Sequence, residues 1–261
     1  MIEKKENTES NPQKIKDFFS FLEDMPPFYR LSYKDILFIK QNSSLMPKHL
    51  LSNIDKTDEA LAKLKKSYRL GNYHYKQTYA NSCAIACYMM ASSNYLKKQP
   101  FPSRELEKEI LNKFDNDVSI TKILKFCLNQ NLNIKIFSES DYREIEFEKE
   151  WAEVLRKDFM DFYKNNSENP KTKFIFNQSL EKNLLTDLLM NGESIMVNEL
   201  IHEIPHMRVI SGYDEDTFVV SDPLEYRKSQ MSFTTLNENS KPPLAQFFFS
   251  LTSKKTYDDG E

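Results

Sequence analysis

The residues with the clearest chemical potential lie in the stretch 75–90, which reads YKQTYANSCAIACYMM. Cys83 opens a run without glycine or proline, so we predict a helix with Cys83 at its N-terminus. The free N–H groups and positive dipole of a helix N-terminus favour a thiolate, the nucleophilic form of cysteine. Asn81 or Ser82 is the expected cap. Gln77 lies six residues earlier, where its side-chain N–H and the backbone N–H of Cys83 can form an oxyanion hole.

A base and a carboxylate are expected far along the chain, in the stretch 191–224, NGESIMVNELIHEIPHMRVISGYDEDTFVVSDPL. It predicts a strand at 194–198, a loop with His202 and His206, and two further strands at 207–212 and 217–221. His206 then starts one strand and Asp222 follows the strand paired with it. Because the two strands form an antiparallel hairpin, these side chains meet at one end of the sheet. Cysteine, imidazole and carboxylate together form a generalised nucleophilic triad.

The order Gln77, Cys83, His206, Asp222 resembles that of the papain-like cysteine peptidases. The resemblance is to the branch of double-glycine leader (bacteriocin-processing) peptidases and their stand-alone relatives. It rests on the Gln–Cys spacing, the small-residue and Met-rich helix after the cysteine, the strand NGESIMV, and HMRVISGYD followed by VVSDP, and it covers about residues 75–223. Phytochelatin-synthase-like transferases share the pattern. The family usually has glycine after the cysteine, often in Cys-Gly-Pro-Ala, where this chain has Ala84 and Ile85; this departure bears on the substrate class.

Two other assignments of the same residues remain open. Cys83, Cys87, His202 and His206 form a C-x3-C and H-x3-H set that suits tetrahedral zinc, although Pro205 disfavours a helix across the histidine pair. His202 is also the second candidate for the general base. Cys87 and Cys127 are expected in the core.

Composition narrows the function. The chain has 261 residues, a net charge of -3 and only 4 glycines, and it lacks G-x-G-x-x-G and Walker motifs, so we expect neither nucleic-acid binding nor nucleotide chemistry. Three cysteines do not make a disulfide framework, which indicates a reducing compartment. With no secretion signal or transmembrane span recognised, we expect a cytoplasmic protein, with export by a specialised system as the alternative. No cofactor or metal is expected, and the partner is a peptide or protein substrate.

The remaining pattern predicts a helical N-terminal extension at 1–70 and a papain-like domain at 71–261. The predicted fold is α+β, with a helical subdomain that presents Cys83 and packs on an antiparallel sheet that carries His206 and Asp222. The other predicted helices are 14–22, 33–39, 57–68, 103–114, 118–129, 141–163 and 179–190. The other predicted strands are 132–137, 172–177, 230–234 and 245–252.

The function expected from these residues is a cysteine peptidase that cleaves a peptide or amide bond through a thioester. An acyl or peptidyl transferase would use the same triad, and a catalytically silent peptide-binding relative is a third reading. Reactivity of Cys83 separates the enzymes from the silent relative.

Overall fold

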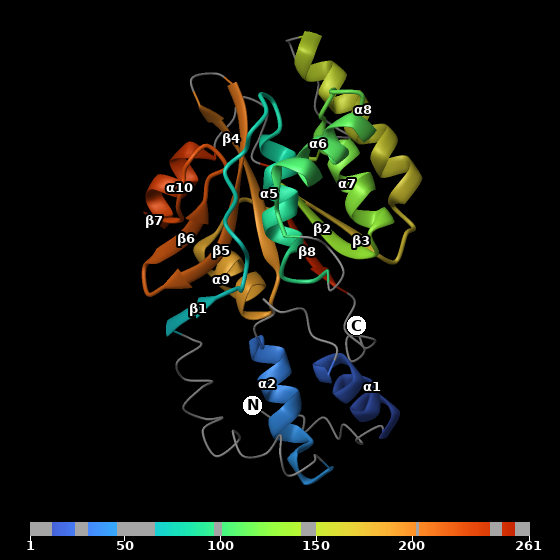
Figure 1. Ribbon diagram of the computed structural model, residues 1–261, viewed down its shortest axis with the longest axis vertical. Helices are drawn as coiled ribbons and strands as arrows, with labels where there is room; N and C mark the ends of the chain where they lie inside the picture. Colours follow the sequence, from blue (N-terminus) through green and yellow to red (C-terminus); the bar gives the residue numbers. More distant parts are fainter. Residues whose placement is uncertain are drawn as a thin grey trace.

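The computed structural model describes residues 12–23, 31–45, 66–96, 101–141, 150–201, 204–240 and 247–253. The protein has an α+β fold, as predicted from the sequence (Figure 1). Its helices are α1 (Pro12–Glu23), α2 (Tyr33–Gln41), the short η1 (Ser43–Leu45), α5 (Cys83–Ser92), α6 (Arg104–Lys113), α7 (Ile120–Asn129), α8 (Glu150–Asn166), α9 (Lys182–Met190) and α10 (Phe233–Asn239). Its strands are β1 (Ser67–Arg69), β2 (Leu132–Ser138), β3 (Thr172–Phe176), β4 (Ser194–Ile201), β5 (Ile204–Asp214), β6 (Thr217–Ser221), β7 (Ser229–Ser232) and β8 (Phe247–Ser253).

The strands of the described chain form one sheet with the order β3-β2-β8-β4-β5-β6-β7, and β1 pairs with β5 beside this path. β2 and β3 are parallel, whereas the other pairs are antiparallel. The sheet is therefore mixed, and its strands around His206 and Asp222 are antiparallel, as predicted. β2 and β3 are parallel because the crossover between them contains α8, and a long crossover is what parallel pairing needs.

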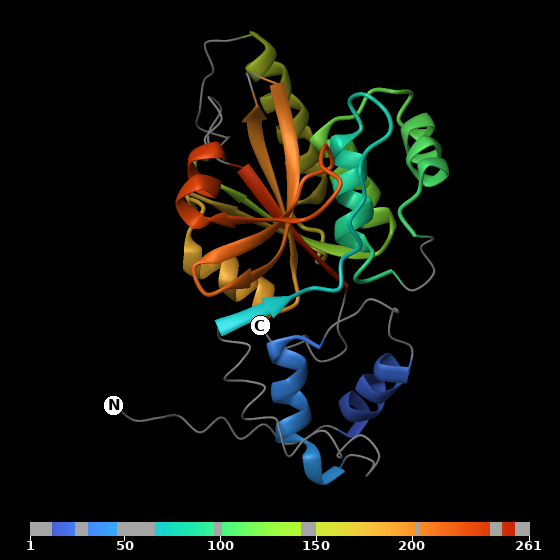
Figure 2. The same cartoon turned by 60° about the vertical axis from the view of Figure 1, so that its left-hand side comes forward.

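Helices cover both faces of the sheet, with α5 to α8 on one side and α9 and α10 on the other (Figure 1 and Figure 2). Side chains in the central strands alternate between the two cores: Met196 packs under α5, while Ile195 and Val197 pack on the side of α9. A sheet buried on both faces selects continuous apolar runs, because every side chain enters one core or the other. This explains the apolar stretch at 247–249 in β8.

Helix α5 is enclosed by the core. Every residue from Ala84 to Ser92 is buried, and a helix that is apolar all round is stable only when it is enclosed. The Cys87 thiol donates a hydrogen bond to the carbonyl oxygen of Met207 on β5, at 3.1 Å. Cys87 lies one helical turn after Cys83, so this contact fixes α5 against the strand that carries His206.

Several predicted elements need correction. The helix predicted at 57–68 is replaced at its end by strand β1, and residues 57–65 lie outside the described chain. β1 approaches β5 so closely that a Cβ atom at Gly212 would lie 2.5 Å from the carbonyl oxygen of Tyr68. Gly212 thus permits the pairing of β1 with β5, which the local helix propensity of residues 57–68 did not predict.

The strand predicted at 230–234 ends at Ser232, because Ser232 instead caps α10 by accepting a hydrogen bond from the N–H of Thr235. The predicted helix 141–163 is found from Glu150 to Asn166, and residues 142–149 are not described.

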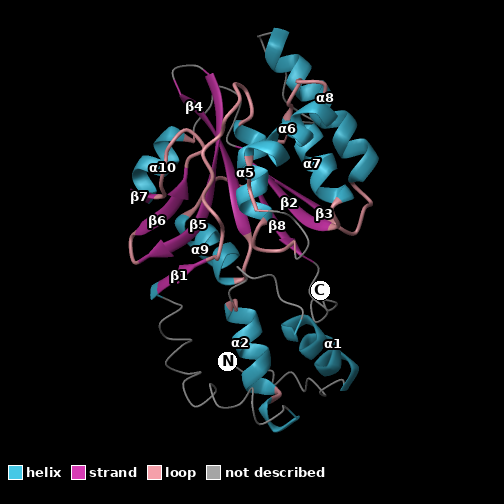
Figure 3. Cartoon of the chain, in the orientation of Figure 1, coloured by secondary structure: helices cyan, strands magenta, loops and turns pink. Residues whose placement is uncertain are grey.

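The N-terminal helices α1 and α2 lie at one end of the molecule, away from the central strands (Figure 3). The two helices contact each other through Phe18 and Phe38, whose rings pack edge to face with their centroids 4.9 Å apart. A reciprocal capping box between Ser32 and Asp35 starts α2. The division into an extension at 1–70 and a domain from residue 71 stays a prediction. In the described parts of the chain, no helix is both long enough and apolar enough to cross a bilayer.

Candidate active site

Strands β5 and β6 position the imidazole and the carboxylate. β4 and β5 both extend further than predicted, so His206 lies within β5, opposite Glu199 of β4, and not in a loop before the strand. The β5–β6 register pairs Val209 with Ser221. Asp222, the next residue after β6, therefore lies beside Arg208. Because His206 and Arg208 are two residues apart on one strand, both side chains reach the same carboxylate.

Asp222 is the centre of this polar group. Its Oδ1 atom lies 2.9 Å from Nε2 of His206 and accepts the backbone N–H of Leu224 at 2.8 Å, and its Oδ2 atom accepts Nε of Arg208 at 2.7 Å. Burial alone raises the pKa of a carboxyl group, but the hydrogen bonds from His206, Leu224 and Arg208 outweigh burial and lower the pKa of Asp222 below its usual range. Asp222 is therefore ionised near neutral pH.

His206 connects Asp222 to the cysteine. Burial alone lowers the pKa of its imidazole, but the hydrogen bonds and negative charges of Asp222 and Cys83 outweigh burial and raise the pKa of His206 to about 9. Its Nε2 atom is bonded to Asp222, which leaves Nδ1 as the ring nitrogen for the Cys83 thiol. The structure thus brings Cys83 of α5 together with His206 of β5 and with Asp222, although α5 and β5 are far apart in the sequence.

Cys83 is the first residue of α5 and is half-buried, whereas Cys87 and Cys127 are fully buried. Ser82 occupies the cap position, but its side chain accepts no hydrogen bond from the helix. Its hydroxyl instead donates to the carbonyl oxygen of Tyr79 and to Glu107. Ser82 therefore occupies the expected N-cap position, but its side chain does not cap the first N–H groups of α5.

Gln77 lies next to the same site through its backbone. Its N–H donates to the carbonyl oxygen of Pro223 at 2.8 Å, directly after Asp222. One N–H of its side-chain Nε2 donates to the carbonyl oxygen of Tyr79 at 3.1 Å. An amide nitrogen carries two N–H groups, and within the described residues only one of them has an acceptor. A further link between the two loops joins Nε2 of His74 to the carbonyl oxygen of Glu225 at 3.1 Å.

Sequence reasoning missed Glu199 and Arg208. The Arg208 Nη1 atom lies 2.7 Å from Oε2 of Glu199, and Arg208 also holds Asp222. Glu199 is fully buried, and neither of its oxygens has an aligned hydrogen-bond partner in the part of the chain that the structure describes. Burial raises its pKa, and the charge of Arg208 opposes that rise. The sequence signal that could have indicated these residues is a charged residue within an otherwise apolar strand, namely Glu199 in NEL and Arg208 in HMR.

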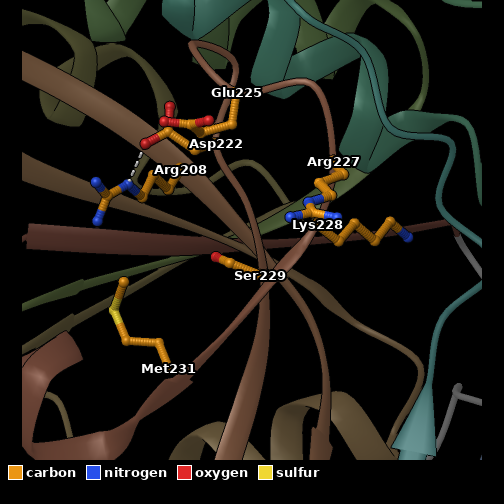
Figure 4. Close-up of a pocket in the computed structure, with 7 residues that line it drawn as sticks. All are labelled: Arg208, Asp222, Glu225, Arg227, Lys228, Ser229 and Met231. Carbon is orange, nitrogen blue, oxygen red and sulfur yellow. Dashed lines mark hydrogen bonds and ion pairs between the residues drawn. The ribbon is translucent and has the colours of Figure 1, made fainter.

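A cavity of about 540 Å³ lies beside Asp222 (Figure 4). Arg208 and Asp222 form part of its wall, and residues 225–231 supply much of the rest. Side chains of both charges line it, with Arg227 and Lys228 opposite in sign to Glu225. Asp222 thus reaches this cavity, but Cys83, Gln77 and His206 are not among the residues that line it.

His202 lies outside the described residues, so the zinc set and the second candidate base remain unplaced. Among the residues that are described, no three histidine, cysteine, aspartate or glutamate side chains form a group that could hold a metal ion. Burial raises the pKa of the Cys87 thiol well above the ordinary value and hence keeps it protonated.

The raised pKa of His206 predicts a pH-dependent stability. Because the folded value of about 9 exceeds the unfolded value, the imidazolium stabilises the fold fully below pH 6.5 and loses this effect as the pH rises through 9. Urea unfolding of the wild type and of His206→Gln should therefore give a stability difference that falls by roughly 2–3 kcal/mol between pH 6 and pH 9.5. A difference that stays constant over this range would contradict the shift.

Comparison with known proteins concerns the fold. No protein-family model matches the chain. No curated protein matches it either. Among solved structures, the peptidase domain of ComA from Streptococcus, a bi-functional ABC transporter of a quorum-sensing pathway, is similar at 10% identity and a TM-score of 0.40, covering 69% of this chain and 98% of that domain. A putative C39-like peptidase from Bacillus anthracis is similar at 12% identity and a TM-score of 0.23, over 26% of this chain and 46% of its own.

Proposed function

We propose that the protein is a thiol-dependent hydrolase that cleaves a peptide or amide bond through a Cys83–His206–Asp222 triad. The observation that carries the proposal is the position of His206, whose Nε2 atom lies 2.9 Å from Oδ1 of Asp222 and whose pKa is raised by both Asp222 and Cys83. A base between a nucleophile and an orienting carboxylate is the arrangement that covalent catalysis requires. The resemblance of the sequence to papain-like peptidases points to a peptide as the substrate.

In the first half of the reaction, the Cys83 thiolate attacks the carbonyl carbon and forms a C–S bond. The negative charge moves to the carbonyl oxygen, where the free N–H of Gln77 Nε2 and the backbone N–H of Cys83 stabilise it. The C–N bond then breaks, and the His206 imidazolium gives its proton to the leaving amine. Asp222 keeps the ring in place and stabilises its charge, and a thioester on Cys83 remains.

In the second half, water attacks the thioester while the neutral imidazole of His206 takes its proton. The C–S bond breaks, the acid product leaves, and the thiolate–imidazolium pair is restored.

Alkylation by iodoacetamide tests the proposal without knowledge of the substrate. We expect Cys83 of the native protein to react at about pH 6.5, where an ordinary thiol is only about 1% ionised. Cys87 and Cys127 should stay unmodified because both are buried and their pKa values are raised by burial. Mass spectrometry of each cysteine-containing peptide, at a series of pH values, gives the three rates separately.

The matched variants are His206→Ala and His202→Ala. Loss of the imidazolium beside the thiol should slow the alkylation of Cys83 at about pH 6.5 by about tenfold or more, since each pKa unit changes the thiolate fraction tenfold. His202→Ala should retain the wild-type rate. If Cys83 reacts equally slowly in the wild type and in His206→Ala, the nucleophilic assignment fails. If only His202→Ala loses reactivity, His202 is the base.

A further inference from the structure

Glu107 of α6 has a fully buried carboxylate that faces the loop before α5. Its oxygens accept the Tyr75 hydroxyl at 2.7 Å, the backbone N–H of Thr78 at 3.0 and 3.1 Å and the backbone N–H of Tyr79 at 3.3 Å. The Ser82 hydroxyl donates to it as well. One side chain thus collects donors from both ends of the loop that contains Gln77 and leads into Cys83.

The partners of Glu107 explain why it is buried. A charged acceptor forms stronger hydrogen bonds than a neutral one, and several such bonds together offset the cost of burying a carboxylate. In the described part of the chain, its aligned donors are neutral hydroxyl and backbone groups. The contacts therefore fix the conformation of the loop and do not form an ion pair.

The same loop contains the hydrogen bond that orients the Gln77 side chain. The carbonyl oxygen of Tyr79 accepts both the Gln77 side chain, at 3.1 Å, and the Ser82 hydroxyl, at 2.6 Å. Glu107 holds the N–H of Tyr79 and the hydroxyl of Ser82. It consequently fixes the carbonyl group that orients Gln77. Asn81, which adopts a left-handed conformation with φ of 61°, completes the turn between these residues.

We propose that Glu107 is a positioning residue of the oxyanion hole: it holds the loop 75–82 so that Gln77 directs its free N–H to the carbonyl oxygen that Cys83 attacks. The inference rests on the proposed function, since it assigns the orientation of Gln77 within that same site. Glu107 is fully buried against the loop, and its negative charge opposes the charge that develops in the transition state. Its contribution is therefore geometric.

Two reactions of Cys83 separate positioning from general structural damage. Acylation by p-nitrophenyl acetate passes through a tetrahedral oxyanion: the C–S bond forms, the C–O bond breaks, and p-nitrophenolate leaves as an anion. Alkylation by iodoacetamide displaces iodide in one step and forms no oxyanion. The rate of p-nitrophenolate release, followed by stopped-flow absorbance, depends on the oxyanion hole, and the alkylation rate reports an intact thiol and imidazole.

We expect Glu107→Gln to slow acylation by about tenfold and Glu107→Met by about 10²-fold, with the rate of alkylation unchanged, because removal of an oxyanion donor typically costs 10²–10³. Glu105→Gln is the matched control, because Glu105 lies in the first turn of the same helix. The hydrogen bonds that lower the pKa of Glu105 come from its own backbone and from Ser103. It should leave both rates unchanged.

A double-mutant cycle with Gln77→Ala identifies the route of the effect. If Glu107 acts through Gln77, then Glu107→Gln should cost little further acylation in the Gln77→Ala background. Equal losses in both backgrounds, or parallel losses of acylation and alkylation, would overturn the positioning role. Should Glu107→Met fail to fold, Glu107→Gln decides the question. If the wild-type Cys83 reacts with neither reagent faster than in His206→Ala, the proposed function itself fails.

Discussion

Exchange of Asp222 for alanine is expected to slow the acylation of Cys83 by about 10²–10⁴-fold, the contribution usual for a general base and the carboxylate that orients it. Asp222 binds His206 at 2.9 Å and is the largest favourable influence on the imidazolium. Without it, burial lowers the pKa of His206, and the ring loses its fixed orientation. The measurement is the burst of p-nitrophenolate release at a series of pH values.

Asp222→Asn makes this prediction more specific. The amide preserves the shape of Asp222 but not its charge, so we expect an intermediate rate and an upper limit of the pH–rate profile that moves down from the His206 value of about 9. The fold is checked in the same samples by the protection of Cys87 and Cys127, which stay buried in an intact core. A wild-type rate and an unmoved profile in both variants would exclude Asp222 as the partner of the base.

Arg208→Met is expected to lower the free energy of unfolding by about 3–5 kcal/mol, the cost of leaving a buried charge unpaired. Arg208 lies between two carboxylates, 2.7 Å from Glu199 and 2.7 Å from Asp222. Methionine fills a similar volume but cannot balance either charge. Urea denaturation at neutral pH measures the loss. Combining Arg208→Met with Glu199→Gln should restore part of it, because one unpaired carboxylate is then removed.

The matched control for this prediction is Arg156→Met on α8. Arg156 pairs with Glu153 at 2.6 Å, but about a quarter of each side chain is exposed, at 24% and 28%. A solvent-accessible pair contributes about 0–1 kcal/mol, so this variant should lose little stability. Equal losses in Arg156→Met and Arg208→Met would mean that the Glu199–Arg208–Asp222 group does not carry the expected electrostatic energy.

Much of the fold follows from local patterns in the sequence. Helix α5 was predictable from a long apolar run without helix breakers, and the strands around His206 from apolar runs separated by turn residues. Errors occurred where tertiary contacts override local preference. Residues 67–69 read as the end of a helix but form β1, because β5 offers a free edge beside Gly212. The parallel pairing of β2 and β3 likewise depends on a crossover and not on either strand's own sequence.

For the site, the sequence by itself determined the candidate residue types and their order: Cys83, His206 and Asp222 stand at the ends of predicted elements, where side chains can meet, and Gln77 lies six residues before the predicted helix. Only the tertiary structure decided which charges support them. The β4–β5 register places Glu199 beside Arg208. The packing of α6 places Glu107 against the loop before α5. Hydrophobic periodicity encodes which face of an element is buried, but the pairing of buried charges depends on distances between elements, and no local pattern contains those distances.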